Sequence, residues 1–170
     1  MPKIHTHLSL ALKLSKRIHI NDLNAFLLGN TYPDIWDENI DDALHLHYKK
    51  DADSECDLTS FLVDNNLNDE FHLGYYFHLW VDNQIKYIDL LNISKYDCMI
   101  CDYEMISPFI STLQANHDKE KLALNNIYKL SNEPMPLYLV HHNKKQQYLD
   151  ILDTLVDQFI EHLKKIGVNL

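Results

Sequence analysis

The 170-residue chain has few residues that interrupt helices and no long apolar stretch. Only 3 Gly and 5 Pro occur, which disfavours a turn-rich β-sandwich and favours helices. The longest stretch without Asp, Glu, Lys or Arg, Met105–His117, is too short and too polar to span a bilayer, which takes about 20 apolar residues. The amino end has no apolar stretch followed by a small-residue cleavage site. The three cysteines form no disulfide-type framework. We therefore expect a cytoplasmic protein with no transmembrane segment.

The charge balance is acidic, with 15 Lys and Arg against 25 Asp and Glu, a net charge of −10. Basic patches supply the attraction to nucleic acid and to anionic membrane surfaces, so nucleic acid is an unlikely partner. With 46% hydrophobic and 24% charged residues, the composition is that of a globular protein. The length fits one domain over residues 1–170. The eleven histidines are the unusual feature that needs an explanation.

Apolar residues recur with helical spacing over most of the chain. The expected helical segments are 8–14, 26–28 closed by Gly29 and the Pro33 loop, 57–67, 69–91, 107–113 opened by Ser107-Pro108, about 118–130 capped by Asp118, and a long final helix that ends at Gly167. No alternating strand pattern is visible. The sequence predicts an all-α fold: a single-domain helical bundle with a metal site between helices and an N-terminal loop.

The clearest chemical signal is His78-Leu79-Trp80-Val81-Asp82. Residues four apart share one helix face, so the His78 ring and the Asp82 carboxylate can meet at one ion. The apolar flanks predict a buried helix, where a carboxylate must be paired or bound to a metal. Gly74, one turn earlier, makes room for an ion or a crossing helix. Alone, such a pair is more often an ordinary helix pair and such a glycine a packing glycine.

The other candidates are equally unspecific when taken singly. His7 shares a face with Ala11 and is either a core histidine or a helix-entry residue. Asp34 after Pro33 fits an Asx-type turn that caps the next helix. His45 and His47 lie two residues apart, so at most one of them is expected to point at a given centre, and either choice remains open.

Taken in chain order, four segments resemble the zinc-dependent phospholipase C family, whose all-α fold is shared with single-strand-specific zinc nucleases. Thr6-His7 resembles its amino-terminal TH element, and Phe26-Leu27-Leu28-Gly29-Asn30-Thr31-Tyr32-Pro33-Asp34-Ile35 its FLLGxxxPDI loop. His47-Tyr48-Lys49 resembles SHF, and Leu73 to Asp82 resembles LGYYxHLxxD. The match covers roughly the first 90 residues.

The resemblance implies a ligand set. Asp34, His47, His78 and Asp82 would surround one zinc ion, and Asp82 would bridge to a second ion that also takes His7. Asp34 would be a ligand or the catalytic base for the attacking water. The long family members bind a further zinc through two His and a Glu that follow the helical motif. Because no His lies between Asp82 and His117, we expect one or two zinc ions rather than three.

The expected function is that of a zinc-dependent phosphodiesterase, a phospholipase C-like hydrolase acting on a small phosphoester or a phospholipid headgroup. One alternative is a non-catalytic metal-binding helical protein in which zinc is structural or binds a ligand. An HD-type phosphohydrolase ranks third, because its His-Asp dipeptide occurs only as His117-Asp118. A helical interaction module without metal is the remaining alternative. Cys98 and Cys101 are expected to be buried thiols rather than a redox or zinc pair.

Overall fold

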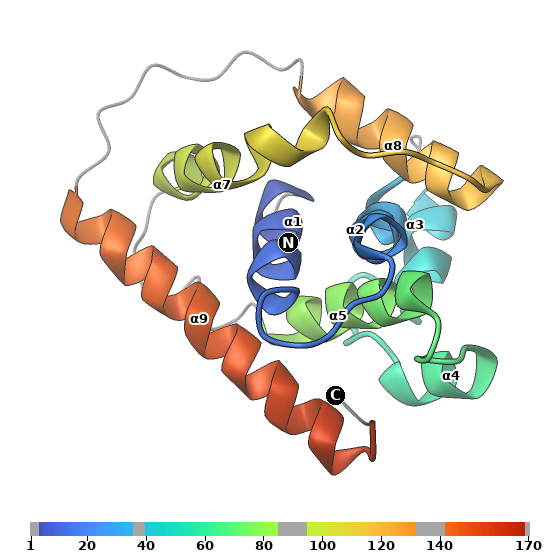
Figure 1. The fold of residues 1–170 in the computed structure, drawn as a ribbon. Coiled ribbons are helices and arrows are strands. Elements are labelled where there is room, and N and C mark those ends of the chain that lie inside the picture. The colour runs from blue at the N-terminus through green and yellow to red at the C-terminus, as the bar shows by residue number, and fades with distance from the viewer. Residues whose placement is uncertain (1–3, 36–39, 85–94, 132–141, 169–170) are drawn as a thin grey trace.

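A computed structural model describes residues 4–35, 40–84, 95–131 and 142–168 of the chain (Figure 1). The elements in these ranges are helical: α1 (Ile4–Leu14), α2 (Leu23–Thr31), the 3₁₀ turn η1 (Tyr32–Asp34), α3 (Ile40–Leu46), α4 (Leu58–Asp64), α5 (Glu70–Gln84), α7 (Lys95–Ile110), α8 (Asp118–Ser131) and α9 (His142–Lys165). No strand occurs within the described ranges, and the all-α prediction is confirmed. None of the described helices is long and apolar enough to cross a membrane.

The first two helices and α5 form the centre of the molecule. α2 crosses α5 in close contact, and α1 contacts α2 and α5 on one side and α7 and α9 on the other (Figure 1). α8 covers α2 and η1, whereas α4 packs against α5. The later helices therefore form an outer layer around the segments that carry the candidate ligands.

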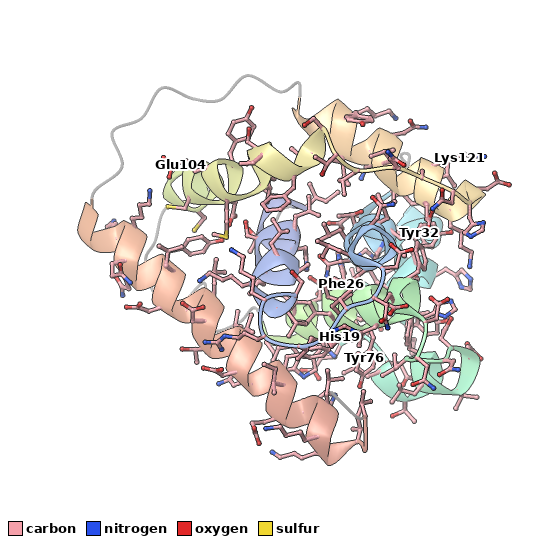
Figure 2. The ribbon with its side chains drawn as sticks, in the orientation of Figure 1. His19, Phe26, Tyr32, Tyr76, Glu104 and Lys121 are labelled. Carbon is pink, nitrogen blue, oxygen red and sulfur yellow. The ribbon has the colours of Figure 1, made fainter. Side chains whose placement is uncertain are left out.

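One apolar core joins these layers. Phe26 of α2, Phe77 of α5 and Phe159 of α9 are each 0% exposed, and they belong to one continuous cluster of buried residues. In Figure 2, Phe26 lies among the central helices, whereas Glu104 and Lys121 lie at the periphery. Burying such aromatic side chains contributes about 1.5–3 kcal/mol each, so this cluster stabilises the packing of the helices that share it.

Two glycines allow α2 and α5 to approach closely. A Cβ atom on Gly74 would lie 2.0 Å from the backbone oxygen of Phe26, and one on Gly29 would lie 1.9 Å from the backbone oxygen of Phe71. Both distances are far below van der Waals contact. Gly74 therefore makes room for a crossing helix, and Gly29 lies inside α2 rather than closing it.

Three other predicted boundaries differ from the structure. α7 begins at Lys95, so the helix predicted to open at Ser107-Pro108 is wrong; Pro108 lies inside the last turn of α7. α3 was not predicted. α4 ends at Asp64 rather than Leu67. The expected end of the central helix, beyond Gln84, lies outside the described residues.

α1 and α2 are longer than predicted: α1 begins at Ile4 rather than at Leu8, and α2 spans Leu23–Thr31 rather than 26–28. The last two boundaries lie closer to the prediction. α8 spans Asp118–Ser131, close to the predicted 118–130, but Asp118 is its first residue rather than its N-cap. Gly167 follows α9 with a φ of +82°, a left-handed conformation that favours glycine and ends helices.

Candidate metal centre

His7 lies in the buried part of α1. The helix is covered by α2, α5, α7 and α9, so almost all its side chains face protein, and His7 itself is 1% exposed. An imidazole in such a position needs polar partners, because burying an unpaired polar group is unfavourable.

Asp34 and His47 come from two short elements beside α5. Asp34 ends η1, whose start is favoured by Pro33. His47 directly follows α3, and its backbone N–H still bonds the carbonyl of Ala43 at 3.1 Å. The His47 side chain is 3% exposed and that of Asp34 is 13% exposed. Asp34 is thus the most accessible of the five candidate ligands.

His78 and Asp82 lie one turn apart on α5, with side chains 0% and 1% exposed. The close crossing of α2 at Gly74 brings the end of α2 and η1 over this face of α5. The sequence places these residues on one face through helical spacing alone.

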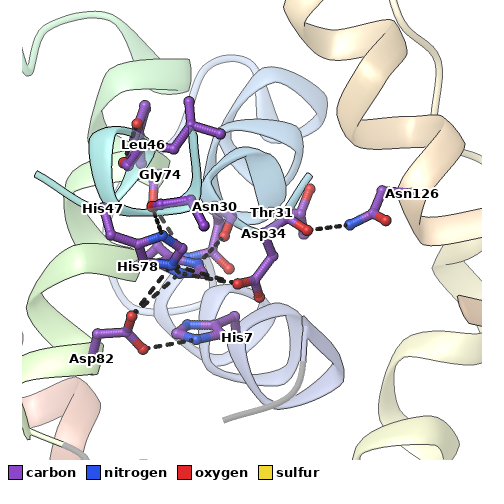
Figure 3. Close-up of polar contacts among 12 residues, drawn as sticks. His7, Asn30, Thr31, Asp34, Leu46, His47, Gly74, His78, Asp82 and Asn126 are labelled. Atoms are coloured by element: carbon purple, nitrogen blue, oxygen red, sulfur yellow. Dashed lines mark hydrogen bonds and ion pairs between the residues drawn. The ribbon is translucent and has the colours of Figure 1, made fainter. Parts of the chain in front are cut away.

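The structure brings all five side chains together (Figure 3). His47 Nε2 lies 3.5 Å from Asp34 Oδ1 and 3.5 Å from Asp82 Oδ2. His78 Nε2 lies 3.9 Å from Asp34 Oδ1 and 3.7 Å from Asp82 Oδ2. On the other side of the carboxylate, His7 Nε2 lies 3.4 Å from Asp82 Oδ1.

These contacts form two overlapping groups with the spacing of metal ligands. One contains His7, His78 and Asp82, and the other contains Asp34, His47 and His78; within each group the ligand atoms lie within 4.8 Å of one another. The rings of His7 and His78 stack with centroids 3.7 Å apart. Asp82 presents Oδ1 to His7 and Oδ2 to His47 and His78, so its two oxygens face different partners.

Backbone carbonyls orient two of the three imidazoles. His78 Nδ1 donates to the Asn30 carbonyl at 2.7 Å, and His47 Nδ1 donates to the Ala43 carbonyl at 2.8 Å. A carbonyl only accepts, so in each neutral ring the proton is on Nδ1 and the lone pair on Nε2. These two Nε2 atoms lie 3.3 Å apart. Two lone pairs that face each other repel unless a proton or a cation lies between them.

The carboxylate of Asp82 is buried without ordinary hydrogen bonds. Within the described ranges, neither of its oxygens has a hydrogen-bond partner, and the same holds for His7 Nδ1. Buried carboxylate oxygens normally accept hydrogen bonds or bind a cation. The Asp82 oxygens are directed toward imidazole nitrogens 3.4–3.7 Å away, which is the arrangement of ligands around a shared cation.

The five groups shift one another's pKa values. Burial alone would raise the pKa of Asp34 and of Asp82, but the neighbouring imidazoles hold both values below the usual range. Burial, together with the charge of His7, lowers the pKa of His78 to about 3, which keeps this ring neutral. Burial also opposes the charged form of His47, but the nearby Asp34 and Asp82 carboxylates raise the pKa of this ring overall. Ionised carboxylates and a neutral His78 are the protonation states that metal binding requires.

The residues on which the alternative predictions depended lie outside this centre. His45 is exposed, so His47 is the member of the pair that joins the cluster. His117 and Asp118 line a separate hollow of about 370 Å³ at the start of α8, together with Asp69 and His72. Cys101 is buried and Cys98 is half-buried, and neither forms a disulfide.

Sequence reasoning missed the groups that hold the ligands in place. The Asn30 and Ala43 carbonyls orient two rings, but backbone acceptors give no sequence signal. Asn126 of α8 donates from Nδ2 to the Asp34 carbonyl at 2.9 Å (Figure 3). It lies 92 residues from Asp34, in the half of the chain for which no motif was recognised.

Comparison with protein-family models, with curated proteins and with solved structures gives no match for this chain. The geometry of the centre and the four sequence segments are therefore what a functional assignment rests on.

Proposed function

We propose that this chain is a zinc-dependent phosphodiesterase of the phospholipase C type, with one or two zinc ions held by His7, Asp34, His47, His78 and Asp82. The observation that carries the proposal is the Asp82 carboxylate. It is buried, its oxygens lack hydrogen-bond partners among the described residues, and each oxygen faces a different set of imidazole nitrogens.

The donor set fits zinc. Imidazole nitrogens and carboxylate oxygens are its ordinary protein ligands outside thiolate sites. The tautomers fixed at His47 and His78 leave Nε2 free to coordinate in both rings. Outer hydrogen bonds of this kind are typical of histidines that bind metals. Asp82, which contacts both groups, would be the bridging ligand.

Bound zinc would supply Lewis-acid stabilisation of the phosphoryl oxygens and would lower the pKa of a bound water to about 7. Asp34 directs Oδ1 at His47 and His78, which leaves Oδ2 to take the proton of the attacking water. As the most exposed of the five side chains, Asp34 marks the side from which substrate would approach.

The net charge of −10 favours a small or zwitterionic phosphoester, such as a phospholipid headgroup, over long nucleic acid. An anionic phosphodiester remains compatible with this charge, because bound divalent ions dominate the local field.

The test compares His78→Ala and Asp82→Ala with the matched control His45→Ala, which removes an exposed histidine two residues before His47. We expect both site variants to bind zinc at least about 100-fold more weakly. The binding free energy of a structural zinc ion is about 10–16 kcal/mol, and each substitution removes one of about four ligands. Calorimetric titration of metal-stripped protein measures this. Hydrolysis of phospholipid, nucleotide and generic phosphodiester substrates should vanish in the same variants. Unchanged zinc stoichiometry in both would contradict the site.

A second function follows from the enclosure of the centre. Four of the five side chains are at most 3% exposed, which suits a structural zinc without an open position for water. The zinc titration and the hydrolysis assays separate the two functions. Zinc binding without hydrolysis of any substrate would favour the structural role, whereas hydrolysis that is lost together with zinc would favour the enzyme.

A further inference from the structure

A second buried carboxylate lies on the far side of α1. Asp102 of α7 is 0% exposed and accepts a hydrogen bond from Thr6 Oγ1 at 2.7 Å. Tyr148 of α9 donates its hydroxyl to the same carboxylate at 2.9 Å. Thr6 and Tyr148 are also almost fully buried. This carboxylate cluster (Thr6, Asp102 and Tyr148) joins α1, α7 and α9 in the interior.

Burying the Asp102 carboxylate is unfavourable in free energy, so packing alone does not account for the cluster. Among the described residues, no lysine or arginine pairs with Asp102, so hydroxyl groups are its main support. A buried ionised group supported in this way is often replaceable by apolar side chains without loss of stability. Its presence here therefore suggests a role beyond holding three helices together.

The position of the cluster points to His7. Thr6 is the residue before His7 on α1, so the bond from Thr6 to Asp102 fixes the rotation and height of the turn that carries the imidazole. His47 and His78 are each oriented by a carbonyl, but His7 Nδ1 has no hydrogen-bond partner within the described ranges. The contact of Thr6 with Asp102 therefore fixes the backbone of His7, whereas no hydrogen bond within the described ranges fixes Nδ1 of its ring.

The charge of Asp102 acts in the same direction. Asp102 and His7 interact electrostatically. Two divalent ions would bring four positive charges into the interior, and the ligands Asp34 and Asp82 would offset only two of them. A further carboxylate behind His7 reduces the remaining imbalance.

We propose that Asp102 is a positioning residue for His7, and that through Thr6 and through its charge it strengthens zinc binding at the His7–His78–Asp82 group. This inference rests on the proposed zinc centre. Asp102 itself contacts none of the candidate ligand atoms in the described residues, so it would act through Thr6 and through its charge.

The test is a calorimetric titration of metal-stripped full-length protein with zinc, in parallel with thermal unfolding of the metal-free form. His7→Gln first identifies the ion that the His7 group binds. We expect Asp102→Asn to weaken the binding of that ion about 10-fold, the lower end of the effect of losing a partner bonded directly to a metal ligand, because Asp102 acts through Thr6 and through its charge. The metal-free thermal midpoint of Asp102→Asn should equal or exceed that of the wild type.

Two further variants keep the test decisive if Asp102→Asn folds poorly. Thr6→Val removes the hydroxyl donor and should weaken the same ion, whereas Thr6→Ser keeps the hydroxyl and should retain wild-type affinity. Asp153→Asn is the matched control. Asp153 also ties α9 to α1, through Lys13 at 2.8 Å, but at the surface, so zinc affinity should not change.

The outcomes separate this inference from the function. A wild type that binds no zinc contradicts the proposed function and this inference with it. If the wild type binds zinc and the affinity is unchanged in Asp102→Asn and Thr6→Val, only the positioning role is overturned. The same follows if His7→Gln leaves zinc binding unchanged. A lower metal-free midpoint with unchanged zinc affinity would assign Asp102 to packing alone.

Discussion

At the scale of single residues, Asp82 decides how the centre is interpreted. A carboxylate in a protein interior is stable when it is protonated, when it accepts hydrogen bonds or when it faces a cation. The imidazoles, His7 first among them, lower the pKa of Asp82, so protonation is disfavoured, and neither oxygen has a hydrogen bond of ordinary length within the described ranges. The Asp82 oxygens face imidazole nitrogens at 3.4–3.7 Å, which is the geometry on which the proposed zinc site rests.

Which residues could be predicted depended on how they act. The five candidate ligands come from side-chain patterns in recognisable segments, and the structure brings these side chains together. The groups that orient them act through backbone carbonyls, as at Asn30 and Ala43, or from distant helices, as with Asn126. Neither kind of contact has a local pattern, because each depends on how the helices pack.

Asp102 gives a pH prediction at the same scale. Burial raises its pKa to about 6, well above the usual value of 3.8 for an aspartate. The folded state therefore binds more protons than the unfolded state between these values, and this group lowers stability as pH rises through that window. Because Asn does not titrate, the stability of metal-free Asp102→Asn relative to wild type should increase between about pH 4 and pH 6.5, by about 1.4 kcal/mol for each unit of pKa shift.

Urea unfolding of both metal-free proteins across this pH range measures the difference. The contributions of Asp34 and Asp82 largely cancel, because both proteins contain these residues. A stability difference that stays constant from pH 4 to pH 7 would mean that Asp102 keeps an ordinary pKa in the folded protein.

At the scale of elements, the crossing of α2 and α5 builds the centre. It brings η1, with Asp34, next to His78, and it lets the Asn30 carbonyl reach the His78 ring. Helical periodicity predicted α5 and the start of α8 well, because their apolar spacing and first residues are regular. The start of α7 was missed, since Ser107-Pro108 imitates a helix start and the preceding residues mix polar and apolar side chains.

Gly74→Ala tests the crossing. The added Cβ would collide with the backbone of α2, which cannot move aside as a side chain can. We expect a loss of about 3 kcal/mol in the free energy of unfolding, at the upper end for overpacking, although Ala is the better helix former. Chemical denaturation of metal-free protein measures this loss.

Gly167→Ala serves as the comparison. A Cβ there meets no atom within 4 Å, and only the left-handed backbone opposes the substitution, so about 1 kcal/mol should be lost. Equal effects at the two glycines would mean that the close approach of α2 and α5 contributes little to stability.

At the scale of the whole molecule, the two halves of the chain contribute different residues to the candidate centre and its surroundings. The segments that resemble the phospholipase C family lie in roughly the first 90 residues and supply every candidate ligand. α7, α8 and α9 surround them and contribute Asp102, Asn126 and Tyr148. Composition and periodicity sufficed to predict an all-α protein. The contacts that α7, α8 and α9 make with the first half depend on long-range packing, for which the sequence gives no local pattern.

The most direct test is anomalous X-ray diffraction at the zinc edge from crystals of the metal-replete full-length chain. The account predicts one or two anomalous peaks among the five ligands, about 2.0–2.1 Å from the Nε2 atoms of His47 and His78, with one of the peaks in contact with Asp82. Zinc-replete crystals with no anomalous peak among these side chains, and with water alone between them, would contradict it.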